Sequence, residues 1–273
     1  TRRLGTRRGP GRAAEQPKHA ATGVEMAPAA TMAGDMNAPL LPLVPYAPRL
    51  TLDVVADFTC PWSFLGLRRI ARALGNVQGL PQPPLIRWHG FRLPRDGSAE
   101  ARAAWRAHLA TRLPPGMTPE FSEHGLEEGG RELGIRFDFA RIAGVPDTGQ
   151  AHRLMLLAAR EGRQSGVADA IFRAYFEDGR DIGDRAELAR VGQEAGLSGE
   201  ALQAFDDASQ EGEAVAAEEQ RLRALGVENV PNLLLNGRVL VPGPADVDTY
   251  LQALDQAMFP GTPPTATNPR LLN

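Results

Sequence analysis

The chain contains a single cysteine, Cys60, whose surroundings suit a reactive thiol. Apolar residues at every second position from 52 to 58 predict a strand that ends just before it. Pro61 suits the first position of a helix, where its missing N–H would have no partner. Unpaired N–H groups and the dipole at a helix N-terminus stabilise a thiolate. We therefore expect a nucleophilic Cys60 with a lowered pKa, and the alternative is a small buried hydrophobe.

The elements that would position this cysteine form a β-α-β opening. A helix is predicted over residues 62–74, where apolar side chains follow helical spacing, and Gly75 is expected to end it. A second strand is predicted at residues 85–89. Residues 98–225 then show mainly helical patterns, with capping residues at Thr118, Asp184 and Ser198. The predicted helices lie at 99–113, 119–133, from 148 or 149 to about 163, 167–176, 185–195, after 198, and up to Leu225 before Gly226.

Strand signals return near the end of the chain. Asn236-Gly237 lies between two apolar runs, 233–235 and 238–241, which predicts a hairpin with a type I′ turn. Val230-Pro231 leads into the first of these strands. A closing amphipathic helix is predicted over residues 246–258.

Composition excludes several classes of protein. Of 273 residues, 42% are hydrophobic and 23% charged, which is typical of a globular protein. There is no apolar run of about 18 residues, so we expect no membrane span. The net charge is −3, without a basic patch interleaved with aromatic residues, so nucleic acid is not an expected partner. One cysteine allows no internal disulfide, and with no apolar export signal visible we expect a cytoplasmic protein.

Five segments together resemble the DsbA family of thioredoxin-fold proteins, most closely its FrnE-like branch. They are DFTCPWSFLG at 57–66, AHRL at 151–154, IFRAYF at 171–176, DIGD at 181–184 and GVENVP at 226–231. The resemblance implies an α/β fold, a thioredoxin-like core with an inserted all-helical domain. The expected parts are a disordered extension (1–49), the core (50–97 and 226–258), the helical insertion (98–225) and a loose tail (259–273).

The resemblance also implies thiol–disulfide chemistry at Cys60, with one departure. Ser63 stands where the family usually has a second cysteine, which resolves the mixed disulfide. An outside thiol, such as glutathione or another low-molecular-weight thiol, must then act as cosubstrate, and no permanently bound cofactor is expected. Ser63 either donates a hydrogen bond to the Cys60 thiolate or is an inert polar residue on the first helical turn.

Pro231 would form the family's cis-proline loop, turning the Val230 backbone toward the thiol, where it can pair with an extended thiol substrate. The alternative is a trans proline that leads an edge strand. Pro61, Trp62 and His152 complete the expected thiol-binding set. For His152, a structural hydrogen bond where the core meets the helical insertion is an equally good interpretation.

Other polar residues are candidates for a role at the site. Asp57 could tune the thiol or accept its proton. His89, His108 and His124 lack the spacing of metal ligands, so no metal site is expected. The neighbouring Glu218 and Glu219 are expected on a solvated helix face.

Three functions remain open. The first is a monothiol DsbA-like oxidoreductase acting on a small-molecule thiol or a protein mixed disulfide, as a monomer or homodimer. The second is a glutathione-dependent isomerase or transferase, similar to 2-hydroxychromene-2-carboxylate isomerase and the kappa-class transferases. Ser63 fits that class, whereas residues 241–246 lack the aromatic residue and the arginine of its glutathione segment. The third is a non-catalytic binding module on the same scaffold.

Overall fold

The computed structural model describes residues 49–78, 80, 82–94, 101–113, 116–207 and 211–260, so the predicted extension and most of the predicted tail lie outside the described residues. The elements are, in order, β1 (Thr51–Ala56), α1 (Pro61–Asn76), β2 (Leu85–Gly90), α2 (Ala101–Ala110), α3 (Pro119–Arg131), α4 (Gly149–Arg160), α5 (Gln164–Phe176), α6 (Arg185–Glu194), α7 (Gly199–Asp206), α8 (Glu211–Ala224), β3 (Asn232–Leu235), β4 (Val239–Pro242) and α9 (Val247–Met258).

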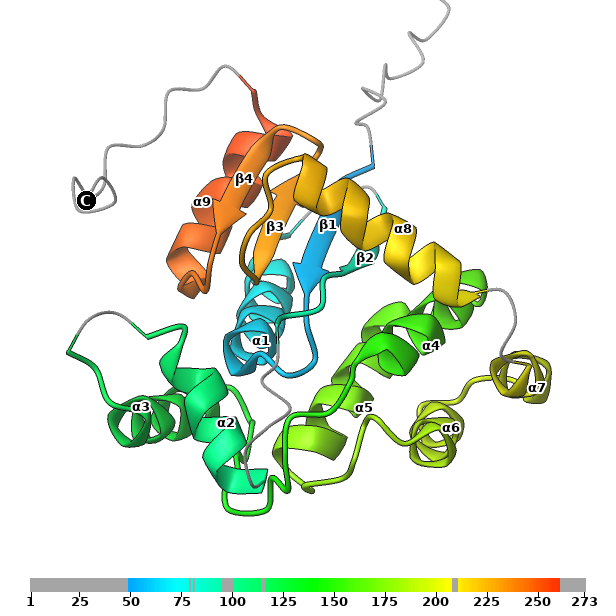
Figure 1. Cartoon of the computed structure of the whole chain (residues 1–273). Coiled ribbons are helices and arrows are strands. Elements are labelled where there is room, and N and C mark those ends of the chain that lie inside the picture. Colours follow the sequence, from blue (N-terminus) through cyan, green and yellow to red (C-terminus); the bar gives the residue numbers. More distant parts are fainter. Residues whose placement is uncertain are drawn as a thin grey trace, which may run out of the picture. The chain divides into compact units, whose positions relative to one another are not determined.

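The described strands form one four-stranded sheet in the order β2-β1-β3-β4 (Figure 1). β1 and β2 are parallel, as the predicted β-α-β opening requires, and β3 runs antiparallel to both β1 and β4. Asn236 and Gly237 both have positive φ angles, of 48° and 64°, as a type I′ turn demands. Leu235 pairs with Val239, so the connection has three residues rather than two.

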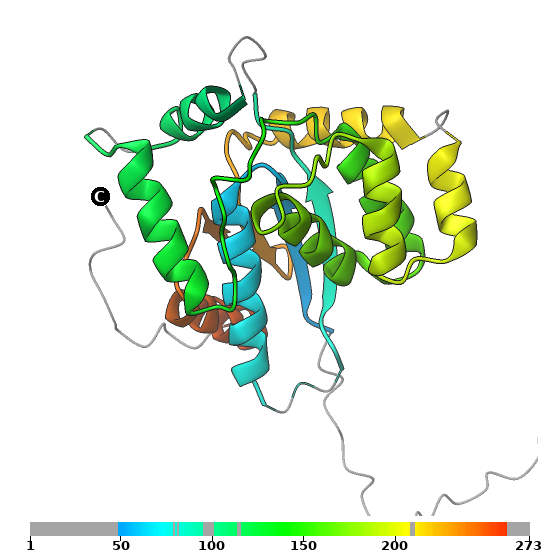
Figure 2. The ribbon, with the colours of Figure 1, turned by 90° about the horizontal axis from the view of Figure 1, so that it is seen from below.

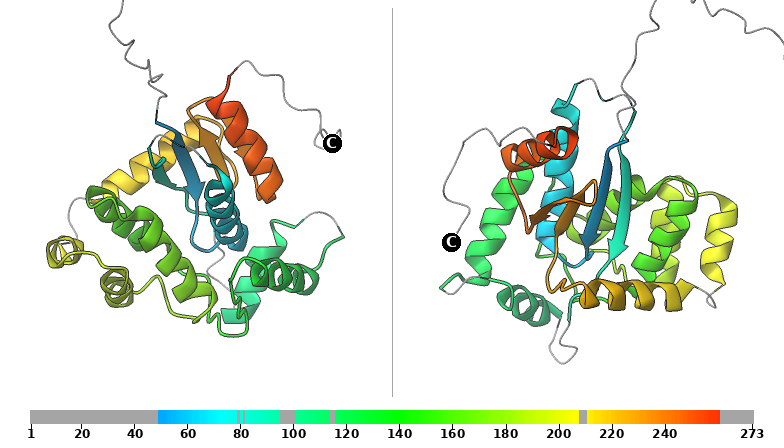
Figure 3. Two further views of the ribbon diagram at one scale, coloured as in Figure 1. Left: turned by 180° about the vertical axis from the view of Figure 1, so that it is seen from behind. Right: turned by 90° about the horizontal axis from the view of Figure 1, so that it is seen from above.

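The two faces of the sheet are covered by different helices. Leu52 and Val54 of β1 belong to the main core, together with residues of α1 and α9. Val55 points the other way and packs with Leu222 of α8. α1 and α9 lie side by side, and α4 to α7 are grouped away from α9 (Figures 2 and 3). α8 packs on both β2 and α4. It therefore connects the sheet to the helices of residues 101–224, which we call the helical region.

Three predicted helix starts are confirmed by their caps, whereas α5 begins at Gln164, three residues before the predicted start. The Thr118 hydroxyl accepts a hydrogen bond from the Phe121 amide, and the Asp184 carboxylate accepts one from the Ala186 amide. The Ser198 hydroxyl accepts one from the Ala201 amide. Each cap satisfies an N–H that has no partner within its helix.

Four predicted helix ends, those of α1, α2, α3 and α4, were wrong by two or three residues. α1 continues through Gly75 to Asn76, and the Val77 amide closes it by donating to the Leu74 carbonyl. The helix predicted to reach residue 163 ends at Arg160, because Gly162 has a φ of +67°. Glycine adopts this left-handed conformation readily and so ends helices.

A chain of aromatic rings joins the helical region to the helix that follows Cys60. Phe172 of α5 lies 4.9 Å from Phe58 and 5.1 Å from Phe64, measured between ring centroids. Phe176 extends the chain toward Trp105 of α2, at 5.9 Å. Such pairs add about 0.5–1.5 kcal/mol each to the stabilisation from burial. The residues on either side of Cys60 are therefore held by side chains from the helical region.

None of the helices in the described ranges combines the length and apolar character needed to cross a bilayer.

Candidate functional site

Cys60 is the N-cap residue of α1, as predicted. Its backbone is extended, and its carbonyl accepts the Ser63 amide at 3.0 Å, which closes the first turn of the helix. Pro61 occupies the first helical position. Behind this turn, the Cys60 amide donates to the Asp57 carbonyl at 3.1 Å.

The structure brings Cys60 next to the loop that precedes β3, although 170 residues separate them. The Cys60 thiol donates to the Val230 carbonyl, with 3.7 Å between sulfur and oxygen. The Val230–Pro231 peptide bond is cis. Gly66, on the second turn of α1, lies next to this loop and to Tyr250 of α9. A Cβ atom there would lie 3.2 Å from the Tyr250 hydroxyl and 3.6 Å from Pro231 Cγ.

The thiol itself is sealed from solvent. Cys60 has an exposed fraction of 0%. It belongs to a small buried cluster, against which half-buried Trp62 packs and whose other members are Val55, Phe91, Leu93 and Leu222. Of the predicted thiol-binding residues, Val230 and Trp62 therefore lie at the cysteine.

Burial raises the pKa of Cys60 to about 11, opposite to the lowered pKa expected from its sequence position. The Ser63 hydroxyl and amide act to lower it, as does the charge of Arg112, whereas the charge of Asp57 raises it further. Removing a charge from water costs more than these few favourable contacts return. While it is buried in this way, Cys60 is a neutral thiol.

Asp57 is also buried, at 1% exposure, and holds several elements together. Its Oδ2 accepts hydrogen bonds from the Thr59 hydroxyl at 3.0 Å and from the Leu93 amide at 2.8 Å. Burial acts to raise the pKa of Asp57, but His152, Leu93 and Thr148 outweigh it and hold that pKa below its usual value. The carboxylate thus stays ionised, which makes it a weak acceptor for a proton from the thiol.

His152 reaches Asp57 rather than the sulfur. Its Nε2 lies 3.5 Å from Asp57 Oδ1, and its ring centroid lies 5.1 Å from that of Phe58. Gly90 makes room for it, since a Cβ atom there would come within 2.7 Å of the ring. The contacts of His152 therefore agree with the structural interpretation and not with direct thiol binding.

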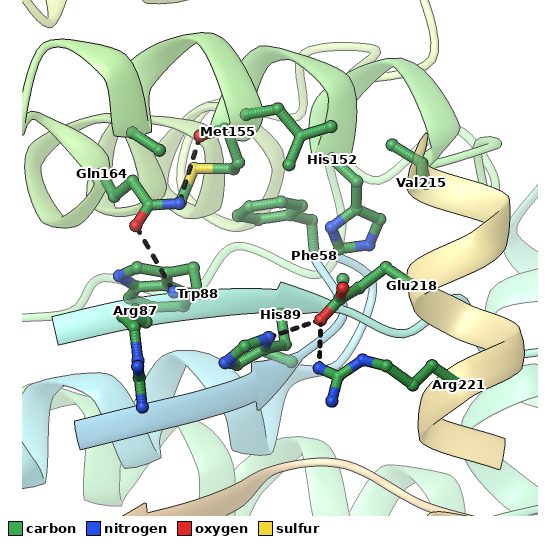
Figure 4. Close-up of a pocket in the computed structure, with 14 residues that line it drawn as sticks. Phe58, Arg87, Trp88, His89, His152, Met155, Gln164, Val215, Glu218 and Arg221 are labelled. Atoms are coloured by element: carbon green, nitrogen blue, oxygen red, sulfur yellow. Dashed lines mark hydrogen bonds and ion pairs between the residues drawn. The ribbon is translucent and has the colours of Figure 1, made fainter. Parts of the chain in front are cut away.

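A cavity of about 340 Å³ opens beside His152, where β2, α4 and α8 meet (Figure 4). The Gln164 carboxamide closes one end by joining the Trp88 amide to the Met155 carbonyl, at 3.4 and 3.2 Å. At the other end, Glu218 of α8 pairs with His89 of β2.

A larger cavity, of about 820 Å³, runs along the Val230–Pro231 loop and shares Arg87, His89 and Arg221 with the first cavity. Its lining includes Leu222, Val227 and Leu240, and it is mostly apolar. Leu222 belongs both to this lining and to the buried cluster of Cys60, so the cavity adjoins that cluster.

The interpretation of Glu218 and Glu219 as a solvated helix face was wrong. Glu218 Oε1 lies 2.5 Å from His89 Nδ1 and 2.8 Å from an Arg221 nitrogen (Figure 4). Glu219 Oε2 lies 2.7 Å from Arg92 Nε, and Oε1 lies 2.8 Å from an Arg223 nitrogen. Glu219 thereby holds Arg92 in the segment 91–94, whose Phe91 and Leu93 share a buried cluster with Cys60, and sequence reasoning missed this segment. No local pattern marks it, since its partners lie on α8, about 130 residues away.

The described residues hold no group of three or more histidine, cysteine or acidic side chains placed to bind a metal ion. His89 and His108, both considered as ligands from the sequence, have other surroundings. His89 lies between Asp53 and Glu218, and burial lowers the pKa of His108 to about 4.

Known proteins share this architecture. The uncharacterized protein YwbO of Bacillus subtilis (strain 168) is 21% identical over 212 residues, which cover 74% of this chain and 94% of YwbO. The crystal structure of the probable DsbA oxidoreductase SCO1869 from Streptomyces coelicolor superposes with a TM-score of 0.65 and 24% identity, over 81% of this chain and 95% of that one. A 2-hydroxychromene-2-carboxylate isomerase superposes with a TM-score of 0.52 and 15% identity, over 76% and 94% of the two chains.

These likenesses confirm the expected α/β thioredoxin fold. Residues 51–255 also match the model of the DSBA-like thioredoxin domain, and this match spans the sheet, the helical region and the Cys60 turn. The chain therefore belongs to the family of DSBA-like thioredoxin domains, whose members include thiol oxidoreductases.

Proposed function

We propose that this protein catalyses thiol–disulfide exchange with one cysteine, Cys60, as the nucleophile. The observation that carries the proposal is the approach of Cys60 Sγ to the Val230 carbonyl at 3.7 Å, beside a cis proline. An extended thiol substrate lying along this loop would present its own sulfur to Cys60. The mostly apolar 820 Å³ cavity along this loop offers room for the rest of such a substrate.

The exchange balances without a further oxidant. The Cys60 thiolate attacks one sulfur of a disulfide, forms a mixed disulfide, and releases the other sulfur as a thiolate. Since the chain has no second cysteine, an external thiolate must then attack the outer sulfur of the mixed disulfide. This attack forms a new disulfide and restores the Cys60 thiolate. A low-molecular-weight thiol such as glutathione suits this step, and we place the reaction in the cytoplasm, where such thiols are kept reduced.

Intact-protein mass spectrometry tests this proposal. After incubation with glutathione disulfide we expect one glutathionyl group per chain, removed again by reduced glutathione. Cys60→Ser should acquire none, and Ser63→Cys should lose the adduct faster, because a second thiol can resolve it internally. An unmodified wild-type chain at every pH up to about 9 would contradict the proposal.

A glutathione-dependent isomerase or transferase is the second candidate, and one observation favours it. With a thiol pKa of about 11 and a buried Ser63 beside it, the site offers neutral donors to a bound thiolate ligand. Asp246, in the segment where that class binds glutathione, instead caps α9 by accepting the Thr249 amide at 2.7 Å. Isothermal titration of Cys60→Ser with reduced glutathione separates the two. Retained affinity supports the isomerase or transferase, and lost affinity together with a wild-type adduct supports thiol exchange.

A further inference from the structure

Any reaction at Cys60 requires that the side chains covering it move. Cys60 has no exposed surface, and it shares one small buried cluster with Phe91 and Leu93, which follow β2, and with Leu222 of α8. An incoming sulfur atom needs one of these apolar side chains displaced, so the frequency of that displacement sets how often the thiol can react.

The cover segment 91–94 is held by charged side chains at each position. Arg92 pairs with Glu219, and the Arg92 carbonyl accepts from Arg223 at 3.1 Å. The Arg223 guanidinium also lies 4.3 Å from the centre of the Phe91 ring. The Leu93 amide is held by Asp57, and the Pro94 carbonyl accepts from Arg112 at 3.5 Å.

Glu219 joins two of these side chains, Arg92 and Arg223. Its two oxygens are divided between Arg92 and Arg223, and its side chain is only 12% exposed. Leu222 lies three residues further along α8, hence on the same side of the helix. One helix therefore contributes both a side chain that covers the sulfur and the carboxylate that holds the rest of the cover. A cavity of about 220 Å³, lined by Asp57, Arg92, Glu219 and Arg223, adjoins this cluster.

We infer that Glu219 is a positioning residue that limits access to Cys60. Through Arg92 and Arg223 it holds segment 91–94 and α8 closed over the sulfur. The inference rests on the proposed function, in which Cys60 is the reacting group. Loss of the Glu219 charge weakens its three charge-assisted hydrogen bonds with Arg92 and Arg223 while keeping the shape of the side chain. The cover then opens more often, and the sulfur meets water and reagents more often.

The test is the rate of Cys60 alkylation by iodoacetamide, a neutral reagent, followed by mass spectrometry from pH 7 to pH 10. We expect Glu219→Gln to react about tenfold faster than wild type, as the loss of a hydrogen bond to a charged group implies. Its pH profile should also shift to a lower apparent pKa. Glu219→Asp should lie between the two, and Arg92→Met should act like Glu219→Gln. Glu213→Gln, an exposed glutamate on the same helix, is the matched control and should react like wild type.

Leu222→Ala removes part of the cover directly and should react faster whatever holds it. If Leu222→Ala is fast while Glu219→Gln equals wild type, the inference is overturned, and equal acceleration by Glu213→Gln also overturns it. Amide exchange at Leu93 gives a second readout, expected to rise in Glu219→Gln with little change at Leu52. Alkylation needs no redox chemistry, so acceleration without any glutathionyl adduct would refute the proposed function and leave this inference standing.

Discussion

At the scale of the residue, two opposing effects act on the Cys60 thiol. A helix N-terminus stabilises a negative charge by about 0.3–2 kcal/mol. Complete burial of an ion costs several kcal/mol, so burial dominates, and the pKa rises to about 11. The sequence position of Cys60 predicts the first effect only. The second depends on the buried cluster around Cys60, which includes Leu93 and Leu222 from distant parts of the chain.

This raised pKa links stability to pH. The unfolded thiol ionises near pH 9 and the folded one near pH 11, so the unfolded state binds fewer protons between these values. The free energy of unfolding should therefore fall as pH rises from 9 to 11, by at most about 3 kcal/mol. Urea unfolding of wild type and Cys60→Ala at pH 8 and pH 10.5 measures the effect. The loss should be larger in wild type, and equal losses in both proteins would show that Cys60 is not buried in solution.

Ser63 gives a second prediction at this scale. Its hydroxyl lowers the pKa of Cys60 in part, so Ser63→Ala should raise that pKa and slow alkylation at any pH below it. A shift of half a unit to one unit corresponds to a decrease of about threefold to tenfold in rate. The pH dependence of iodoacetamide alkylation measures it, with Ser122→Ala as a control at another buried serine. An unchanged profile would favour the inert interpretation of Ser63.

At the scale of the element, local chemistry predicts where helices start better than where they end. Thr118, Asp184 and Ser198 cap their own helices with side-chain oxygens, so the residue type is enough to locate the start. Glycine ends a helix only where it takes a positive φ, as Gly162 does and Gly75 does not. That conformation depends on the direction in which the chain leaves the helix, so the two glycines cannot be told apart from sequence.

Gly66 and Gly75 of α1 also differ in what a side chain would meet. At Gly66 a Cβ atom contacts the Tyr250 hydroxyl and Pro231, whereas at Gly75 nothing lies within 4 Å. We expect Gly66→Val to lower the free energy of unfolding by about 1–3 kcal/mol through overpacking. Gly75→Val, the matched control, should change it by less than about 0.5 kcal/mol. Urea unfolding measures both, and equal effects would contradict the close packing of α1 on the Pro231 loop.

At the scale of the whole molecule, the candidate site depends on contacts between segments far apart in sequence. Cys60 and Ser63 are visible in the sequence as a cysteine and a serine at a helix start. The approach of Val230 to the sulfur followed from a family resemblance, since no periodicity connects residues 170 positions apart. Neither the local sequence nor the family resemblance indicates which side chains bury the thiol. It arises because Glu219 and Leu222 are placed by the packing of α8 on β2, which only the folded chain shows.

The aromatic contacts around Phe172 give a prediction about the described fold as one cooperative unit. Phe172 of α5 is fully buried and contacts Phe58 and Phe64, the residues that flank the Cys60 turn. Phe172→Ala should lower the free energy of unfolding by about 3–5 kcal/mol. Phe121→Ala, at a ring that is 68% exposed, should change it by less than about 0.5 kcal/mol. Because Phe172 links the helical region to the core, urea unfolding followed by circular dichroism and by tryptophan fluorescence should give coincident transitions. Two separate transitions in wild type would mean that the helical region unfolds independently and does not stabilise the Cys60 turn.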